Sequence, residues 1–491
     1  MLNIYTCILL FLCISFVIFG FFYSKNDNSL SSYLNANRSI RSTSLTASIV
    51  ASCFGVWILI GPAEAATWGG IGAITGYALG QACPYLAMSV FGKRLRNIMP
   101  KGNSLTQFVF ARYGSTMLQI VLVLSLFYMF IYLCAEVTAI AKVVQLISGT
   151  DLWKTSLLIL VSTLVYTLKG GLKISIITDK FQFIIICIFL IFIFYFLFFS
   201  GEINISSKLI GLKASNLIDP KYFYGYTAGI TFFIAVFATN LFDQGVWQRV
   251  YAAKSNQHLE SGFKNSFFIV LPVILILGFC GIIAVSLGQT KDPSTVVFAM
   301  LLGSGNQWLS IAILILALIL VISSMDTLIN AISSLLVIES KKLIQLKSRM
   351  SHLNFSKIIL VVLSLLVFYV ASKGLSVLYM FLLADLLCCA AAVPVFYGMF
   401  KNDTSGKGSV IAACSGLVAG LLLFPDLTFQ KSILVGGLLD SKYFPSWIST
   451  ALLFWSFLLA TLIPLFMTLI LRNKKHKFKF SRIKVLVTEI K

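Results

Sequence analysis

The sequence predicts an all-α polytopic membrane protein, and three observations lead to that fold class. The chain has 491 residues, of which 58% are hydrophobic and only 11% are charged. Its mean hydropathy is +0.94, far above that of a soluble domain. About thirteen apolar runs approach the ~20 residues that a helix needs to cross a bilayer. Their expected cores are residues 4–23, 45–66, 71–91, 116–146, 155–168, 174–199, 225–247, 266–287, 309–338, 357–371, 375–399, 408–424 and 447–471.

The first run, from Ile4 to Tyr23, is expected to be a retained transmembrane helix. No basic residue precedes it and no small-residue cleavage site follows it, so both marks of a secretory signal peptide are missing. Residues 1–43 are therefore expected to form an additional transmembrane helix and a cytoplasmic loop.

The second run, from Ser44 to Trp68, is interrupted by Gly55, Gly61 and Pro62. A break inside the bilayer frees backbone N–H and C=O groups, which lipid cannot satisfy but protein or a polar cavity can. Secondary transporters build their ion and substrate sites from such discontinuous helices. This run is therefore predicted to form half of a binding site near the membrane midplane.

The basic residues predict the orientation of the chain. If the N-terminus lies outside and the runs alternate, most of the 38 Lys and Arg residues fall in cytoplasmic segments, as the positive-inside rule requires. The net charge of +21 is then a topology signal rather than a sign of nucleic-acid binding. We expect a multi-pass protein of the cell (inner) membrane with a cytoplasmic C-terminus, and residues 472–491 as a basic tail at anionic lipid headgroups.

Several composition features argue against an enzyme. The ten cysteines are scattered without metal-ligand spacing, and the three histidines lie in expected loops or the tail. No nucleophile–base pair falls within a span. No phosphate-binding P-loop is present either, which argues against ATP-driven transport by this chain alone. The expected partners are a small solute, a coupling ion and the bilayer, with no nucleic acid and no obligatory protein partner.

Acidic residues within the spans are the first candidates for function, because a carboxylate in the bilayer costs a few kcal/mol unless it is paired or wet. Structural roles compete with that interpretation: Asp243 could cap a helix or pair with a basic residue, Glu136 could pair with Lys142, and Asp179 with a neighbour such as Lys180. Whether Glu64, Asp326 and Asp385 are functional or structural stays open. Six of the seventeen acidic residues belong to this group: Glu64, Glu136, Asp179, Asp243, Asp326 and Asp385.

Two adjacent hydroxyl groups, Ser323 and Ser324, lie in the otherwise apolar stretch from Leu316 to Ser334. Serines in membrane helices often bond to a carbonyl one turn earlier, which is the structural alternative. A hard cation such as Na⁺ prefers oxygen ligands, which two hydroxyls and the carbonyls of a broken helix supply. The two stretches together are therefore predicted to form an ion site.

Several short motifs follow one another along the chain in an order that occurs in one known family. They are Tyr166-Thr167 with Gly170-Gly171-Leu172, Thr178-Asp179 with Gln182, Asp243-Gln244 with Trp247-Gln248-Arg249, and Ser323-Ser324. With these motifs the chain resembles the sodium:solute symporter family over roughly residues 44–400. The resemblance implies a core of five plus five helices in inverted repeat, with broken first and sixth core helices. The repeats would be residues 44–200 and 222–400, followed by additional helices in 401–471.

The resemblance also implies a binding site. Sodium would be the coupling ion, held by the backbone carbonyls of Ala51, Phe54 and Leu320 and the hydroxyls of Ser323 and Ser324. Asp179 matches an acidic residue linked to sodium coupling or release. The substrate residues would be Ser52, Cys53, Trp57, Phe237, Thr239 and Asn240.

The expected function is sodium-coupled symport of a small organic solute, an amino acid such as proline, or pantothenate. Proline carriers of the family have an acidic residue where this chain has Cys53, so urea- or choline-type symport is the alternative, as is a solute sensor without useful flux. Trp57 could offer a cation–π face, although membrane tryptophans more often anchor at the interface. Proton coupling also stays open.

Overall fold

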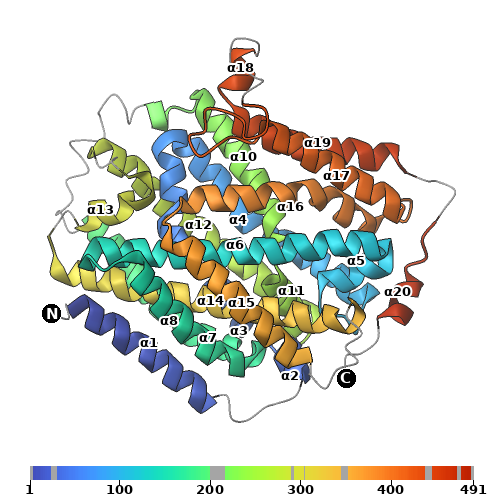
Figure 1. Ribbon diagram of the computed structural model, residues 1–491, viewed down its shortest axis with the longest axis horizontal. Helices are drawn as coiled ribbons and strands as arrows, with labels where there is room; N and C mark the ends of the chain where they lie inside the picture. The colour runs from blue at the N-terminus through green and yellow to red at the C-terminus, as the bar shows by residue number, and fades with distance from the viewer. Residues whose placement is uncertain are drawn as a thin grey trace.

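The computed structural model describes residues 4–23, 30–199, 216–288, 292–302, 305–343, 352–436, 445–472 and 477–487. Across these residues the elements are helices, with two isolated β-bridges and no strand, which confirms the all-α class (Figure 1). The elements are α1 Ile4–Tyr23, α2 Leu30–Asn35, η2 Ala36–Arg38, α3 Ser42–Cys53, η3 Val56–Leu59, α4 Gly61–Ile98, α5 Leu105–Tyr113, α6 Ser115–Ser148, α7 Leu152–Gly170, α8 Leu172–Phe199, α10 Phe223–Asn240, α11 Gln244–Ala252, α12 Asn256–Ser286, η4 Pro293–Thr295, α13 Val296–Leu302, α14 Gln307–Leu343, α15 His352–Ser372, α16 Val377–Phe400, α17 Gly406–Leu423, α18 Ser446–Ser449, α19 Leu452–Ile470 and α20 Ser481–Leu486.

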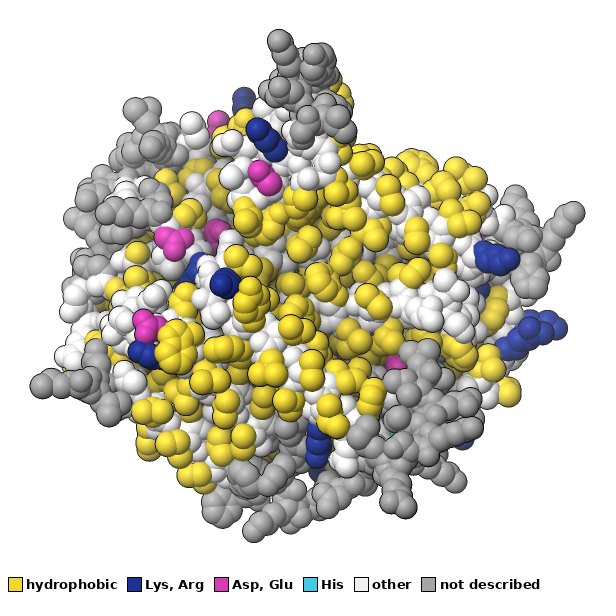
Figure 2. Space-filling view, viewed as in Figure 1, with side chains coloured by type: hydrophobic (Ala, Val, Ile, Leu, Met, Phe, Trp, Pro, Cys, Tyr) yellow, Lys and Arg dark blue, Asp and Glu magenta, His cyan; other side chains and the backbone are white. Residues whose placement is uncertain are grey.

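Eight of the described helices are long and apolar enough to cross a bilayer, and ten spans result if each of two bent helix pairs counts as one. The chain is thus a multi-pass membrane protein, while the expected count of about thirteen spans stays a prediction. Figure 2 shows one face on which hydrophobic side chains are widespread, with charged side chains mainly in its left part and at its right edge. Large hydrophobic side chains are exposed on α8 and α15, as at Ile191 and Leu365.

The first bent pair lies where glycine and proline interrupt the second apolar run. Helix α3 ends at Cys53, and the chain continues from Val56 at an angle of 62°. A Cβ atom at Gly55 would overlap the carboxyl group of Glu136, so the break admits only glycine without rearrangement. Pro62 occupies the first turn of α4, where its missing N–H has no partner to lose.

The second bent pair consists of α10 and α11, which meet at 55°. Asp243 ends the break by accepting the backbone N–H groups of Gly245 and Val246 at 2.6 and 3.3 Å. The helix-cap role considered for Asp243 is therefore present. A short parallel bridge joins the two bent pairs, because Ile40 precedes α3 and pairs with Ala253 at the end of α11.

Helices α4 and α10 cross closely because small residues face each other. Cβ atoms at Gly72 and Gly76 would overlap the backbone carbonyls of Gly225 and Gly229. Small residues allow such close backbone approach between membrane helices, where dispersion contacts replace the hydrophobic effect as the driving force. This crossing fixes α10, which carries part of the cavity described below.

We expect Gly76→Ala to destabilise the protein by about 1–3 kcal/mol, because the added methyl forces the two backbones apart. Alanine's better helix propensity contributes about 1 kcal/mol in the other direction and does not compensate for displacing a backbone. The measurement is the unfolding midpoint in detergent, with the exposed neighbour Thr75→Ala as control. A Gly76→Ala protein as stable as this control would contradict the close crossing.

Candidate functional site

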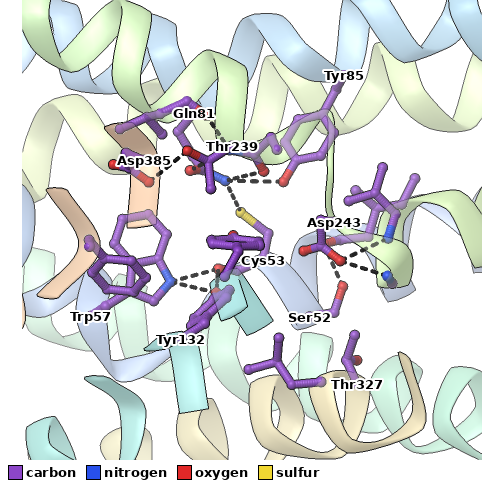
Figure 3. Close-up of a pocket in the computed structure, with 18 of the residues that line it drawn as sticks. Ser52, Cys53, Trp57, Gln81, Tyr85, Tyr132, Thr239, Asp243, Thr327 and Asp385 are labelled. Carbon is purple, nitrogen blue, oxygen red and sulfur yellow. Dashed lines mark hydrogen bonds between the residues drawn. The ribbon is translucent and has the colours of Figure 1, made fainter. Parts of the chain in front are cut away.

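A cavity lies between the two helix breaks, and the empty space within it, including space open to solvent, is about 640 Å³ (Figure 3). Its lining comes from α3, η3, α4, α6, α10, α11, α14 and α16. Five of the six predicted substrate residues line it: Ser52, Cys53, Trp57, Thr239 and Asn240. Phe237 is not among the lining residues and packs against Phe233 with ring centroids 5.7 Å apart. Val236, its neighbour on α10, lines the cavity in its place.

One wall of the cavity is aromatic. The Trp57 ring stacks on Tyr77 at 5.8 Å between centroids and meets the edge of Phe381 at 6.1 Å, and Phe381 also contacts Tyr132 at 5.3 Å. The Trp57 indole N–H donates to the Tyr132 hydroxyl at 2.8 Å. Trp57 is only 4% exposed, so its role is in this wall and not in anchoring at the membrane interface.

Another part of the lining is polar. The Gln81 amide donates to the Cys53 sulfur at 3.1 Å and to the Asn240 carbonyl oxygen at 3.3 Å. Thr239 donates its hydroxyl to the Asp385 carboxylate at 2.6 Å. These bonds join α3, α4, α10 and α16 around the cavity, so that its shape depends on all four helices.

The two serines of α14 lie beside the break after α3. The Ser323 hydroxyl is 3.1 Å from the carbonyl oxygen of Ala51, and the Ser324 hydroxyl is 3.1 Å from that of Leu320. The latter contact is the back-bond considered from the sequence, whereas Ser323 reaches across to the broken helix. Phe54, the remaining expected ligand, follows the last residue of α3 and is buried.

The carboxylate of Glu136 on α6 accepts hydrogen bonds from the backbone N–H groups that the break after α3 leaves free. Its two oxygens accept the backbone N–H groups of Val56 and Trp57 at 2.9 and 3.4 Å, and Ser324 donates to it at 2.9 Å. The residue is completely buried. The pairing with Lys142 considered from the sequence is not formed; the Lys142 ammonium group instead donates to Ser294 at 3.1 Å.

Asp179 of α8 forms a buried ion pair with Arg249 of α11, with 2.9 Å between carboxylate and guanidinium. Ser48 of α3 donates to the same carboxylate at 2.5 Å, and Ser323 lies 3.1 Å from its other oxygen. Arg249 further donates to Thr327 of α14 at 3.0 Å. The partner of Asp179 is thus a residue seventy positions away rather than the neighbouring Lys180.

The family model described as sodium:solute symporter family matches residues 33–416, most of the chain. The chain belongs to this family. Among the proteins similar to this symporter are a spermidine transporter of Candida albicans, 26% identical over 86% of this chain and 82% of its own length, and a probable urea active transporter of Schizosaccharomyces pombe, 22% identical over 81% of this chain and 65% of its own length. The family and these relatives are transporters and not enzymes.

Solved structures agree with the fold of the symporter. A sodium-coupled sialic acid symporter in a substrate-bound, outward-open state has a TM-score of 0.74 at 15% identity, covering 95% of this chain and 97% of that one. The closed structure of Mhp1, a nucleobase–cation symporter, has a TM-score of 0.52 at 13% identity, covering 94% and 99%. At these identities the likeness concerns the fold alone.

The other intramembrane acids of the symporter have local partners. Glu64 lies in the first turn of α4, where the helix dipole favours a negative charge, and accepts a hydrogen bond from Ser376 at 3.3 Å. Asp326 accepts from Asn330 one turn later on α14 at 3.1 Å. Asp385 differs because it lines the cavity.

Sequence reasoning left several residues of this site unassigned. Gln81 interrupts an apolar run as the only amide between Trp68 and Phe91, a signal that was available. The tyrosines of the cavity carry no such signal, since membrane helices contain many. Glu136 stood among the candidate acids, but its contact with the break depends on how α6 packs against η3.

Glu136→Gln is expected to reduce stability by about 1.5–3 kcal/mol. The substitution keeps the shape but replaces one acceptor oxygen by an N–H₂ donor, which faces the N–H of Val56 or Trp57 or the hydroxyl of Ser324. Unfolding in detergent measures the effect. Glu260→Gln removes partly exposed pairs with Lys93 and Lys264 and should reduce stability much less. Equal losses in both variants would show that the carboxylate does not hold the break.

Proposed function

We propose that this symporter couples the downhill entry of sodium to the uptake of a small organic solute across the cell (inner) membrane. The N-terminus would lie outside and the C-terminus in the cytoplasm. Residues 44–200 and 222–400 would form the two inverted repeats, between the N-terminal segment 1–43 and the helices of 401–471, with 472–491 as a basic tail. The bends in α3–α4 and α10–α11 support this division, because each falls near the start of one repeat.

One observation carries the sodium proposal: carbonyl and carboxylate oxygen atoms surround the hydroxyl groups of Ser323 and Ser324. Ser323 lies near the carbonyl of Ala51 and the carboxylate of Asp179, and Ser324 near Glu136 and two carbonyls of its own helix. Two hydroxyl protons thus face five acceptor oxygens. Oxygen atoms of this kind are the ligands that a hard monovalent cation prefers. The ligands proposed are the carbonyls of Ala51, Phe54 and Leu320 and the two serine hydroxyls.

The same contacts support a coupling mechanism. An ion at this place would join α3 to α14 and hold the break in the geometry that shapes the cavity. Opening toward the cytoplasm separates the two helices, removes ligands and lets sodium leave past Asp179. Inward movement of the ion gains ~2.3 kcal/mol per 100 mV of membrane potential. Solute accumulates only if sodium binds better to the outward-open state that also binds solute.

The proposed substrate residues are Ser52, Cys53, Trp57, Thr239 and Asn240, and Phe237 would act only through the packing of α10. The solutes to be compared are an amino acid such as proline, pantothenate, urea, choline and spermidine. Similarity to transporters named for spermidine and urea supports including those two solutes.

The test is uptake into vesicles that contain the purified chain. An inward sodium gradient should drive accumulation of at least one of these solutes above the level reached in potassium medium. Equal accumulation in sodium-free medium would overturn sodium coupling. Sodium-dependent binding of a solute without any accumulation would identify a sensor instead.

A further inference from the structure

Two carboxylates in the cavity have unused hydrogen-bonding capacity. Asp385 accepts one bond, from Thr239. Asp243 accepts the N–H groups of Gly245 and Val246, both at its Oδ1 atom. The Oδ2 atoms of both aspartates have no hydrogen-bond partner within the described part of the chain. Figure 3 shows Asp385 and Asp243 on opposite sides of the cavity.

The negative charge that these two groups carry when ionised is only partly offset by the protein around them. Asp385 is 4% exposed and Asp243 is 8% exposed, so water screens neither well. Neither forms an ion pair with a described residue. Arg249 is the basic side chain in the cavity lining, and its charge is matched by Asp179 at 2.9 Å. When both aspartates are ionised, the lining holds two carboxylates that have no ion-pair partner among the described residues.

The aromatic wall adjoins one of the two carboxylates. Phe381 precedes Asp385 by one helical turn on α16, so the two side chains share a face. Phe381 contacts both Trp57 and Tyr132. Aromatic faces attract ammonium groups most strongly where water is excluded. A carboxylate or a neutral amide group of a solute gains no comparable attraction from an aromatic face.

We propose that the solute is an aliphatic amine with two protonated amino groups. One ammonium group binds Asp385 beside the aromatic wall, and the other binds Asp243 at the opposite side. The methylene chain between them crosses the cavity past Cys53. This assignment rests on the proposed transport function and specifies the solute of that same cavity. It also explains why two carboxylates can be buried in the lining, because the bound solute supplies the positive charges that the protein lacks there.

The test compares three probes of the same carbon chain on purified protein in detergent with sodium: 1,4-diaminobutane, 1-aminobutane and 1-butanol. They carry two, one and no positive charges at neutral pH. Binding, measured by thermal stabilisation, should tighten about tenfold or more with each added charge. Equal or reversed order among the three probes would overturn the proposal, and so would preferential binding of proline or urea. This arm needs no variant.

A second experiment tests whether Asp385 and Asp243 each bind one ammonium group of the diamine. Asp385→Asn keeps an oxygen for the Thr239 hydroxyl, and Asp243→Asn keeps a good helix cap. Each variant should bind the diamine about tenfold or more less tightly, whereas Asp151→Asn, a surface residue paired with Lys154, should bind it like the wild type. Unchanged diamine binding in both cavity variants would overturn the assignment.

The uptake assay separates this inference from the function on which it rests. Sodium-driven uptake of solutes other than amines leaves symport intact and rejects the diamine. Failure of sodium to drive any uptake, with the charge series still observed in binding, rejects symport and leaves the binding site standing.

Discussion

Replacing Arg249 by methionine is expected to destabilise the folded symporter by about 3–5 kcal/mol. The substitution leaves the buried carboxylate of Asp179 without its ion-pair partner, and an uncompensated buried charge is the costly half of a broken pair. It also removes the bonds by which Arg249 joins α11 to α3 and α14. The free energy of unfolding in detergent and the folded yield after purification measure the loss.

A double-mutant cycle identifies the cause. Adding Asp179→Asn to Arg249→Met removes the unpaired charge, so the double variant should recover part of the stability that the single variant loses. Lys154→Met breaks the exposed pair with Asp151 and should change stability by no more than about 1 kcal/mol. If Arg249→Met were no more destabilising than Lys154→Met, the buried pair would not support the fold.

Alanine at Ser324 is expected to raise the sodium concentration for half-maximal uptake about tenfold or more. The variant loses one proposed ligand oxygen, and interactions with charged groups contribute about 1.5–3 kcal/mol, where 1.4 kcal/mol corresponds to a factor of ten. It also deprives Glu136 of a hydrogen-bond donor. Ser323→Ala should act in the same direction, because it breaks the contact with Ala51. Solute uptake at varied sodium concentration measures both effects.

The matched control is Ser334→Ala on the same helix. Ser334 is also buried, but among the described residues its hydroxyl bonds only to the carbonyl of Ala331 at 2.9 Å within its own helix. This variant should insert normally and keep the sodium dependence of the wild type. A shift in Ser334→Ala as large as in Ser324→Ala would point to a general weakening of α14, and unchanged sodium dependence in Ser323→Ala and Ser324→Ala would reject the site.

Short-range patterns in the sequence predicted much of the fold. Apolar runs near bilayer length predicted the helices, and Gly55 with Pro62 predicted where the first of the two bent pairs breaks. These inferences work because a helix in lipid must satisfy its own backbone, so its length and its interruptions are visible in local composition. Motif order then indicated the family that the profile match shows.

The hydrogen-bond and ion-pair partners of the polar residues were much harder to predict from the sequence. Lys142 and Lys180 were reasonable partners by proximity in the sequence, yet Glu136 bonds to the helix break and Asp179 pairs with Arg249. Such contacts depend on which helix faces pack together, and composition within one helix does not encode that. Phe237 shows the same limit, since one position along α10 separates the cavity lining from the face that carries Phe233.

The sequence by itself determined that this chain is a helical membrane transporter with a broken helix and a serine pair in its core. Only the tertiary structure decided which of the acidic side chains lie beside the serine pair and which line the cavity. It placed Glu136 and Asp179 beside the serines, and Asp243 and Asp385 across a partly aromatic cavity. The physical reason is that a carboxylate in a membrane span must find donors or cations, and those come from other helices whose packing is set over hundreds of residues.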